Sequence, residues 1–340
     1  MNSRMESAQL STTDRPPLLE IRHLEKTFIL GKSVIRQLLG RKPEYLRAVH
    51  DVNLHIFPGE CLGLVGESGC GKTTLGRCIL RLYEPDAGQV LFEGQDFLQM
   101  NDRDALKMRQ KMQVVFQDPS SSLNPRMSIM RMLSEASLVH KVCTPREIPD
   151  RIAYLLNMVG LSADLAERFP HELSGGQRQR ISLARALAVE PTFIVADEPV
   201  SALDVSIQAQ VVNLLVELQD RLHLTMLFIT HDLRLVHYVS HRVAVMYLGS
   251  IVELAPSETL FNNPLHPYTR ALLAAAPKVD PRHRVKAPAI KGEPPSPINI
   301  GIGCPFRPRC EIAIDRCSQE DPQLKEIESG HFVSCFRMQA

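Results

Sequence analysis

The order of apolar and polar residues predicts short buried strands that alternate with helices along most of the chain. Continuous apolar runs are typical of buried strands, and they occur at 61–65 and 193–196, while the mostly apolar stretch 112–116 predicts a further buried strand. Segments with helical spacing follow such runs, among them an amphipathic stretch at 206–222. This alternation indicates an α/β fold with a largely parallel sheet, in which ligands bind at the carboxyl ends of the strands.

Three regions depart from this pattern and suggest a domain organisation. The polar start, residues 1–17, predicts a disordered tail ahead of a main domain at 18–255. Within that domain, residues from about 125 to 172 show helical spacing and no strand signal, which predicts an inserted helical subdomain. Residues 256–340 are rich in proline and predict a loop-rich extension that could not build a core alone.

Composition excludes some classes of function. Acids and bases nearly cancel, with a formal net charge of +1, whereas a general nucleic-acid-binding protein would carry a basic excess. No apolar run approaches the roughly eighteen residues of a membrane-spanning helix, and the first residues hold no hydrophobic signal core. We therefore expect a cytosolic protein that, if it works at a membrane, docks there through a partner.

The apolar run at 61–65 leads into a sequence that fits the phosphate-binding P-loop pattern G-x-x-x-x-G-K-[ST]. Glycines let backbone N–H groups point at phosphate oxygens, and the helix that follows adds a partial positive charge. Lys72 can reach the β- and γ-phosphates, and the Thr73 hydroxyl can bind Mg²⁺. The motif predicts an ATP or GTP site made of Gly66, Glu67, Ser68, Gly69, Cys70, Gly71, Lys72, Thr73 and Thr74.

Two acidic residues follow the apolar run at 193–196. Asp197, at the end of a buried strand, can hold Mg²⁺ directly or through water. The next residue, Glu198, is placed to polarise an attacking water as a general base. The pair therefore predicts the second half of a nucleotide-hydrolysing site.

The sequence Leu-Ser-Gly-Gly-Gln at 173–177 supplies a second helix start that can bind an anion. Its glycines expose backbone N–H groups, and Ser174 adds a hydroxyl. This helix start and the P-loop could grip one γ-phosphate only from opposite sides. The economical arrangement is a head-to-tail dimer with the nucleotide between two subunits.

These motifs together resemble those of the ATP-binding-cassette (ABC) ATPases, and the resemblance covers most of the chain. It implies a RecA-like core with an antiparallel β subdomain and an inserted helical subdomain. It also implies that Glu198 is the catalytic base, that Lys72 and His231 hold the γ-phosphate, and that Gln117 contacts Mg²⁺ and the attacking water. Further residues implied at the nucleotide come from the signature motif and the D-loop: Ser174, Gly175, Gly176, Gln177 and Asp204.

The family usually stacks an aromatic side chain on adenine. Phe28 and Tyr45 both qualify, and an insertion between them blurs the correspondence. We favour Phe28 on sequence grounds. The insertion itself resembles that of the F-type ATPase in importers that use two unequal ATPases.

Four further stretches narrow the resemblance to the oligopeptide/dipeptide importer branch, namely 120–126, 199–210, 263–270 and 292–299. The resemblance implies several protein partners: a second ABC ATPase subunit, two transmembrane permeases, and a periplasmic or lipid-anchored solute-binding protein. It implies no nucleic-acid partner. It implies a peripheral position at the cytoplasmic face of the bacterial inner membrane. The transported solute stays open, because relatives with this pattern carry different cargoes.

Four of the eight cysteines lie near the end of the chain with the spacing C-x5-C-x6-C-x17-C: Cys304, Cys310, Cys317 and Cys335. Disulfides are rare in the cytosol, so the cluster is a candidate metal site. Spacing alone leaves an iron–sulfur cluster, zinc and free thiols open, since structural zinc usually shows tight cysteine pairs. The resemblance favours a [4Fe–4S] cluster, because related importer ATPases carry one in this extension.

The main alternative function is that of a soluble ABC ATPase in translation or DNA repair. Such proteins usually carry two cassettes or a long coiled-coil insert, and the sequence shows neither. A plain GTPase would explain neither the motif at 173–177 nor His231. The sequence therefore favours an importer ATPase.

Overall fold

The computed structural model describes residues 16–31, 43–118, 122–275, 292 and 295–339. The chain forms two compact units. Unit one contains Met1–His55, Leu62–Leu98 and His231–Ala340, and unit two contains Ile56–Cys61 and Gln99–Thr230. Most of the predicted N-terminal tail and the middle of the insertion after Phe28 lie outside the described residues.

The N-terminal part of unit one forms a sheet with the strand order β2-β1-β4-β5. Its members are β1 (Leu19–Leu30), β2 (Glu44–Ile56), β4 (Ala87–Phe92) and β5 (Gln95–Asp96), followed by the short helix η2 (Phe97–Gln99). β4 runs antiparallel to β1 and β5. Leu19, Ile21 and Leu24 are buried, so the apolar positions of β1 face the core. The antiparallel β subdomain is thereby confirmed.

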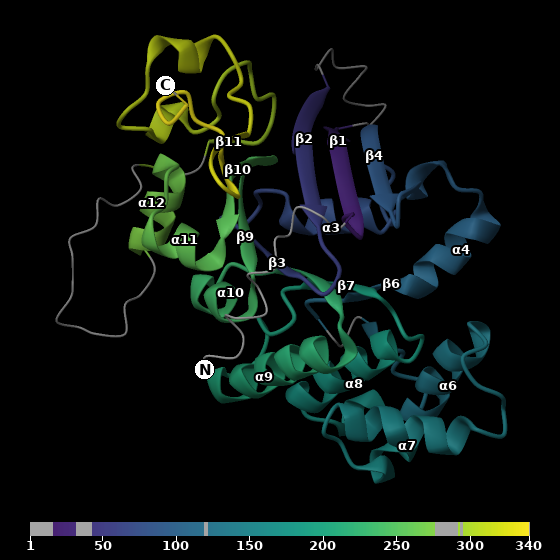
Figure 1. Ribbon diagram of the computed structural model, residues 1–340. Coiled ribbons are helices and arrows are strands. Elements are labelled where there is room, and N and C mark those ends of the chain that lie inside the picture. The colour runs from purple at the N-terminus through teal and green to yellow at the C-terminus, as the bar shows by residue number, and fades with distance from the viewer. Residues whose placement is uncertain (1–15, 32–42, 119–121, 276–291, 293–294, 340) are drawn as a thin grey trace. The chain divides into compact units, whose positions relative to one another are not determined.

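A second sheet in unit one has the strand order β11-β12-β10-β9-β3 (Figure 1). Its strands are β3 (Cys61–Val65), β9 (Arg242–Tyr247), β10 (Ser250–Pro256), β11 (Lys325–Glu328) and β12 (His331–Val333). β3 and β9 are parallel and completely or almost completely buried, as their apolar runs predict. The helices of unit one are α3 (Lys72–Ile79), α10 (Leu233–Val239), α11 (Ser257–Asn262), α12 (Pro267–Ala275), η6 (Arg307–Arg309) and η7 (Asp315–Ser318).

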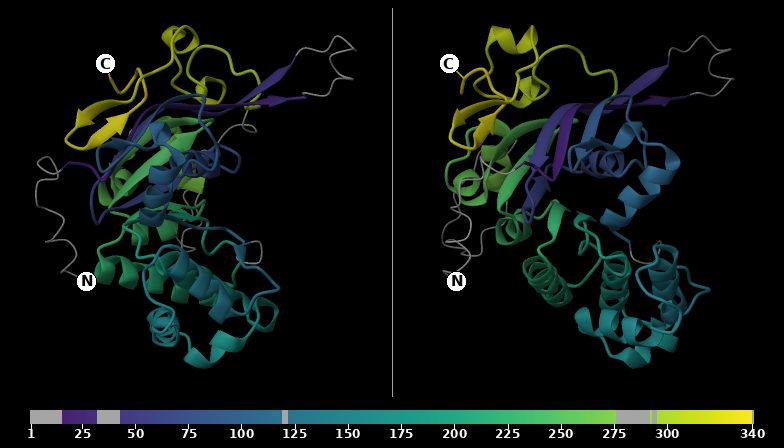
Figure 2. Two further views of the ribbon diagram at one scale, coloured as in Figure 1. Left: turned by 90° about the vertical axis from the view of Figure 1, so that its right-hand side faces the viewer. Right: turned by 45° about the vertical axis from the view of Figure 1, so that its right-hand side comes forward.

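The C-terminal extension joins this second sheet. β12 pairs antiparallel with β10, and β11 pairs antiparallel with β12, so both strands continue the sheet at its edge (Figure 2). The extension is loop-rich, as predicted, but the proline-rich pattern does not reveal these two strands. A segment that cannot build its own core is stabilised by adding strands to an existing one.

Unit two contains a parallel sheet in the order β8-β7-β6. Its strands are β6 (Met112–Val115), β7 (Phe193–Asp197) and β8 (Thr225–Ile229). Between β6 and α8 the described residues hold helices and no strand, which confirms the inserted helical subdomain. The helices of unit two are α4 (Asp102–Lys111), α6 (Ile129–Val139), α7 (Ile148–Met158), η3 (Ala163–Glu167), η4 (Pro170–Glu172), α8 (Gly175–Leu187) and α9 (Val205–Leu222).

Helix α4 is absent from the sequence-based expectations because its apolar signal is weak. Only Ala105 and Met108 of this helix are buried. Its start is set by Asn101, whose side-chain oxygen accepts a hydrogen bond from the Asp104 N–H at 3.0 Å. Capping, rather than an apolar stripe, defines this helix.

A buried contact between a carboxylate and an imidazole attaches the extension to β10. Glu253 on β10 and His331 on β12 have fully buried side chains, with His331 Nε2 2.8 Å from a carboxylate oxygen. The same carboxylate accepts the N–H groups of Leu265 at 2.7 Å and His266 at 2.9 Å. Because a buried carboxylate needs several donors, this residue fixes the turn before α12 and the last strand together.

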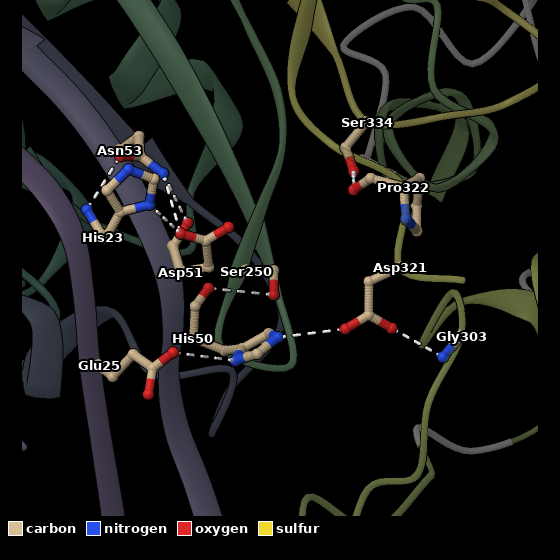
Figure 3. Close-up of polar contacts among 10 residues, drawn as sticks. All are labelled: His23, Glu25, His50, Asp51, Asn53, Ser250, Gly303, Asp321, Pro322 and Ser334. Atoms are coloured by element: carbon tan, nitrogen blue, oxygen red, sulfur yellow. Dashed lines mark hydrogen bonds and ion pairs between the residues drawn. The ribbon is translucent and has the colours of Figure 1, made fainter. Parts of the chain in front are cut away.

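A second polar contact attaches the extension to β2 (Figure 3). His50 Nε2 lies 3.2 Å from one carboxylate oxygen of Asp321, and the other oxygen accepts the Gly303 N–H at 2.7 Å. On its other side, His50 Nδ1 lies 4.0 Å from Glu25. The histidine therefore stands between a carboxylate of the first sheet and one of the extension.

We predict that His266 makes the protein sensitive to acid. Its side chain is buried, its Nδ1 accepts the Tyr268 N–H at 3.1 Å, and burial lowers its pKa to about 4. The unfolded chain, with an ordinary pKa of about 6.5, therefore binds more protons below neutral pH than the folded chain. This contribution to stability is complete above about pH 6.5, and about 2 kcal/mol of it is lost on going from pH 7 to pH 5.

The measurement is the free energy of unfolding in urea at the two pH values. A His266→Asn variant keeps a side-chain acceptor but cannot titrate, so its pH dependence should be smaller by that amount. The control is His223→Asn, because His223 is exposed and has a left-handed backbone that asparagine accepts. Equal pH dependence in wild type and His266→Asn would contradict the prediction.

Candidate nucleotide-binding site

The P-loop of unit one runs from the end of β3 into α3. Lys72, Thr73 and Thr74 form the first turn of α3, and Gly71 caps it with a left-handed φ of 111°. A Cβ on Gly71 would collide with the backbone oxygen of Ala48 on β2. The loop therefore has the strand, glycine turn and helix start that phosphate binding requires, with backbone N–H groups at the start of a helix.

Lys72 is folded back over its own loop. Its side chain is buried, and Nζ donates hydrogen bonds to the carbonyls of Gly66 at 2.8 Å and Glu67 at 3.0 Å. Burial raises the pKa of the neighbouring Cys70 thiol, which keeps it neutral as a small packing residue. The ammonium is thus fixed at the loop, within reach of any anion that the loop binds.

The two aromatic candidates lie on neighbouring strands with different surroundings. Phe28 on β1 packs edge-on against Tyr83, with ring centroids 5.7 Å apart, and Lys26 Nζ lies 5.6 Å from its ring. Tyr45 on β2 is 47% exposed. It lies three residues before Ala48, the residue against Gly71. Because the Tyr45 ring is exposed and the Phe28 ring already packs on Tyr83, we take Tyr45 as the alternative hypothesis to the sequence-based choice of Phe28.

His231 is exposed and lies just before α10, whose N-cap is Asp232. The Asp232 side chain accepts the Arg234 N–H at 2.9 Å, which fixes the start of the helix. His231 therefore stands on a short, well-defined turn of unit one, and the same unit contains the P-loop.

The two acidic residues of unit two with predicted roles at the nucleotide, Asp197 and Glu198, lie at the carboxyl end of β7. Because β6 and β7 are parallel, with Val115 opposite Ala196, the residues that follow both strands meet there. Asp197 is buried at the end of β7. Gln117 Nε2 donates to a carboxylate oxygen of Glu198 at 3.1 Å. The structure thus brings together the predicted base and the predicted glutamine, which are 81 residues apart.

Glu198 has an unusual backbone. Its φ is +47°, a left-handed value that is uncommon for a residue with a side chain, and its N–H donates to the Ile229 carbonyl at 2.9 Å. The Ser201 hydroxyl donates to the Glu198 carbonyl at 3.1 Å. Such conformations persist where the surroundings fix them, and they cluster at functional sites.

The signature helix α8 begins with a complete capping box. The Ser174 hydroxyl accepts the Gln177 N–H at 3.3 Å, and the Gln177 side chain accepts the Ser174 N–H at 2.9 Å. Ser174 and Gly175 are exposed, whereas Gly176 is packed so closely that a Cβ would collide with Ile207. The motif thus builds a rigid, exposed helix start, in which Gln177 serves the cap.

Asp204 of the predicted D-loop is exposed and precedes α9 as its N-cap residue. Unit two therefore carries Gln117, Asp197, Glu198, the signature residues and Asp204, whereas unit one carries the P-loop, the aromatic candidates and His231.

Two contacts to the P-loop have no signal in the sequence. The Glu67 N–H donates to the Tyr268 hydroxyl at 2.9 Å, and the Glu67 carboxylate is paired with Arg309. Both partners lie more than 200 residues further along the chain, in or near the extension. No local pattern could have marked them as part of the site.

The four late cysteines line one small cavity together with Phe306 and Phe336. Burial raises the pKa of the Cys304 thiol to about 11 and also raises that of Cys310. Thiols rather than thiolates are therefore the stable form at these two positions. Among the described residues, no group of three or more His, Cys, Asp or Glu side chains is arranged to hold a metal ion. The described residues therefore hold no preformed site for the predicted [4Fe–4S] cluster.

The chain is similar along nearly its whole length to curated transport ATPases. It is 51% identical over 321 residues to a putative peptide import ATP-binding protein of Brucella ovis, covering 94% of this chain and 98% of the relative. The chain belongs to the ABC transporter ATPases. It is also 47% identical over 329 residues to the oligopeptide transport ATP-binding protein AppF of Bacillus subtilis, covering 96% of this chain and 99% of the relative.

Family models divide this ABC ATPase into two parts. The ABC transporter model matches residues 49–201, and the model of the oligopeptide/dipeptide transporter C-terminal region matches residues 252–317. Every helix in the described ranges is too short or too polar to span a membrane.

Solved ABC cassettes have the same fold. A dimeric cassette in a post-hydrolysis state with ADP and Pi is 28% identical and has a TM-score of 0.60. The match covers 70% of this chain and 98% of the cassette chain. The cassette cbiO1 of Clostridium perfringens is 26% identical and has a TM-score of 0.62. The match covers 73% of this chain and 92% of the cbiO1 chain. These matches confirm the predicted ABC ATPase fold.

We predict that Tyr45, rather than Phe28, stacks on adenine in this ABC ATPase. Base–aromatic stacking contributes roughly 1–3 kcal/mol, so Tyr45→Ala should weaken ATP binding by about tenfold or more. Phe28→Ala should lower the melting temperature instead, because it removes the contacts with Tyr83 and Lys26. Equilibrium binding of ATP and thermal unfolding of both variants separate the two roles. A larger loss of affinity in Phe28→Ala would restore the original assignment.

Proposed function

We propose that this ABC ATPase is the ATP-hydrolysing subunit of a bacterial importer for dipeptides, oligopeptides or a related small solute. The observation that carries the proposal is the match of residues 252–317 to the oligopeptide/dipeptide transporter C-terminal region. The full-length similarity to relatives named for peptide import supports it. A soluble ABC ATPase of translation or DNA repair is not favoured, since such a role would not call for this region.

The P-loop is the proposed phosphate site. Backbone N–H groups of residues 69–73 would donate hydrogen bonds to the phosphate oxygens. Lys72 Nζ, which now donates to two backbone carbonyls, would donate to the β- and γ-phosphates instead. In a head-to-tail dimer, the exposed Ser174 hydroxyl and the backbone N–H of Gly176, both at the start of α8, would face the partner's γ-phosphate, with Asp204 at the same interface. Each chain would thus contribute to two ATP sites.

The residues assigned to Mg²⁺ fit that ion. They are the Thr73 hydroxyl, the Gln117 amide oxygen and the Asp197 carboxylate, which are the hard oxygen ligands that Mg²⁺ prefers. When bound, Mg²⁺ neutralises charge on the β- and γ-phosphates. Asp197 is buried at a strand end, so its carboxylate is held in one position.

Glu198 is the proposed general base. The Gln117 amide holds one of its carboxylate oxygens, and the backbone on either side is fixed by Ile229 and Ser201. An oriented carboxylate of this kind can accept a proton from an attacking water. His231 would contact the γ-phosphate, and movement of Gln117 would carry the state of the site to the membrane subunits.

The proposed importer requires further subunits. We propose a second ABC ATPase, with this chain as the F-type member, two transmembrane permeases, and a periplasmic or lipid-anchored binding protein. The cassette would span 18–255 and the extension 256–340, at the cytoplasmic face of the inner membrane. The family match to a transporter C-terminal region supports an attachment to membrane subunits.

A Glu198→Gln variant tests the catalytic assignment and the transport function together. It should bind ATP with wild-type affinity and hydrolyse it about 10²- to 10⁴-fold more slowly, because a general base typically contributes that much. In cells that express the partner subunits, it should also arrest uptake of a labelled dipeptide. ATP turnover of the purified protein and the uptake rate are the two measurements.

The matched control is Glu217→Gln on the exposed face of α9, which should leave both rates unchanged. Near-normal ATP turnover in Glu198→Gln would show that another group is the base. Slow turnover with undisturbed uptake, or purification with ribosomes or DNA instead of permeases, would favour the alternative function.

We propose as a separate point that the cysteine cavity of the extension accepts a [4Fe–4S] cluster after rearrangement. The support is that all four thiols line one cavity, although they are not preformed for a metal ion. Cluster binding would require deprotonation of thiols whose pKa is raised, so loading would release protons. Iron and sulfide analysis of protein purified without oxygen should give about four of each per chain. Zinc, or no metal, would contradict the proposal.

A further inference from the structure

Glu67 is the point at which the P-loop contacts the C-terminal part of the chain. Its carboxylate is bound by Arg309 through two parallel contacts, Nη1 to Oε2 at 3.0 Å and Nη2 to Oε1 at 3.2 Å. Its N–H donates to the Tyr268 hydroxyl, and its carbonyl accepts from Lys72 at 3.0 Å. The side chain, the N–H group and the carbonyl of Glu67 therefore all take part in hydrogen bonds.

The ion pair is well shielded from water. The exposed fraction of the side chain is 6% for Arg309 and 22% for Glu67. Arg309 also donates to the Gly292 carbonyl at 3.2 Å and lies 3.4 Å from the Tyr247 hydroxyl. A bidentate pair with these additional partners fixes both position and orientation, which distinguishes it from an exposed salt bridge.

The position of the pair matters because the loop is assigned to a highly charged anion. A carboxylate in a phosphate-binding loop repels the ligand, and in a poorly solvated setting that repulsion is only weakly screened. Arg309 neutralises this carboxylate and holds it away from solvent. Without the guanidinium, an uncompensated negative charge would remain beside the phosphates.

Arg309 is attached to the cysteine cavity. It belongs to η6, where the Arg309 N–H donates to the Phe306 carbonyl at 3.0 Å and the Cys310 N–H donates to the Arg307 carbonyl at 3.2 Å. The Cys310 side chain and the Phe306 ring both line the cavity of the four cysteines. Phe306 also packs on Tyr247 and Tyr268, with ring centroids 5.3 and 5.5 Å apart.

We infer that Arg309 is a positioning residue for the P-loop, through which the C-terminal extension controls the affinity for ATP. The inference rests on the proposed assignment of residues 66–74 to ATP. It adds a regulatory role for the extension. Any change at η6 that withdraws Arg309 lowers the affinity, and by thermodynamic reciprocity ATP binding stabilises η6.

The first test measures the equilibrium dissociation constant for ATP in full-length variants. Arg309→Gln should raise it about tenfold, within the usual range of coupling between sites. Glu67→Gln removes the carboxylate that repels the phosphates and should therefore lower the dissociation constant. The double variant Glu67→Gln, Arg309→Gln should return to within about threefold of wild type. A merely structural role of Arg309 predicts no such rescue.

Arg307→Gln is the matched control, because Arg307 belongs to the same turn and is exposed. It should bind ATP like wild type. Wild-type affinity in Arg309→Gln, or a double variant as weak as Arg309→Gln, would overturn the inference. Lys72→Ala separates this outcome from failure of the proposed site, since unchanged ATP binding in Lys72→Ala would remove ATP from the P-loop altogether.

The second test needs neither activity nor the Arg309 variants. Hydrogen exchange at the N–H groups of Arg309 and Cys310 should slow about fivefold or more when ATP is added to wild type. In Glu67→Gln, which breaks the pair from the side of the loop, ATP should leave these rates unchanged. Exchange at η6 that is insensitive to ATP in wild type, or equally sensitive in both proteins, would also overturn the inference.

Discussion

Two backbone carbonyls lie against the P-loop, and the arrangement of unit one depends on them. The Ala48 carbonyl on β2 faces Gly71, and the Met246 carbonyl on β9 faces Gly66, leaving no room for a Cβ at either glycine. β2 and β9 belong to the two different sheets of this unit. The loop is therefore held by both sheets at once, and side-chain hydrogen bonds from Lys72 and Tyr268 add to this backbone packing.

A loop fixed in this way for an anion must also have a favourable electrostatic environment. Lys72 supplies one positive charge, while Glu67 places a negative charge within the same motif. Arg309 compensates that charge from the extension. The P-loop can be recognised from its own residues alone. The negative charge of Glu67 within it is compensated only when Arg309, far along the chain, is in place.

Sequence patterns predicted the parts of the fold that repeat locally. The buried strand before Gly66, the helical subdomain and the helix at 206–222 all follow from apolar periodicity, and the motifs followed from fixed spacing. The convergence of Gln117 and Glu198 follows from parallel strands. In contrast, α4 depends on a cap, β11 and β12 depend on pairing with β10, and the contact of Arg309 with Glu67 spans 242 residues. The strand pairing and the contact of Arg309 with Glu67 leave no local trace, and the cap of α4 is a weaker local signal than an apolar stripe.

Beside the backbone pairing of β12 with β10, three pairs of polar side chains attach the extension to the rest of unit one. Glu253 and His331 join it to β10, His50 and Asp321 join it to β2, and Glu67 and Arg309 join it to the P-loop. Two of these pairs are largely buried, and separating a buried pair leaves an uncompensated charge at a cost of roughly 3–5 kcal/mol. If the extension moved while its contacts with β10 and β2 stayed intact, the pair of Glu67 and Arg309 would be the one to change. This is the physical basis for the inference that a change in the extension acts on the P-loop through Arg309.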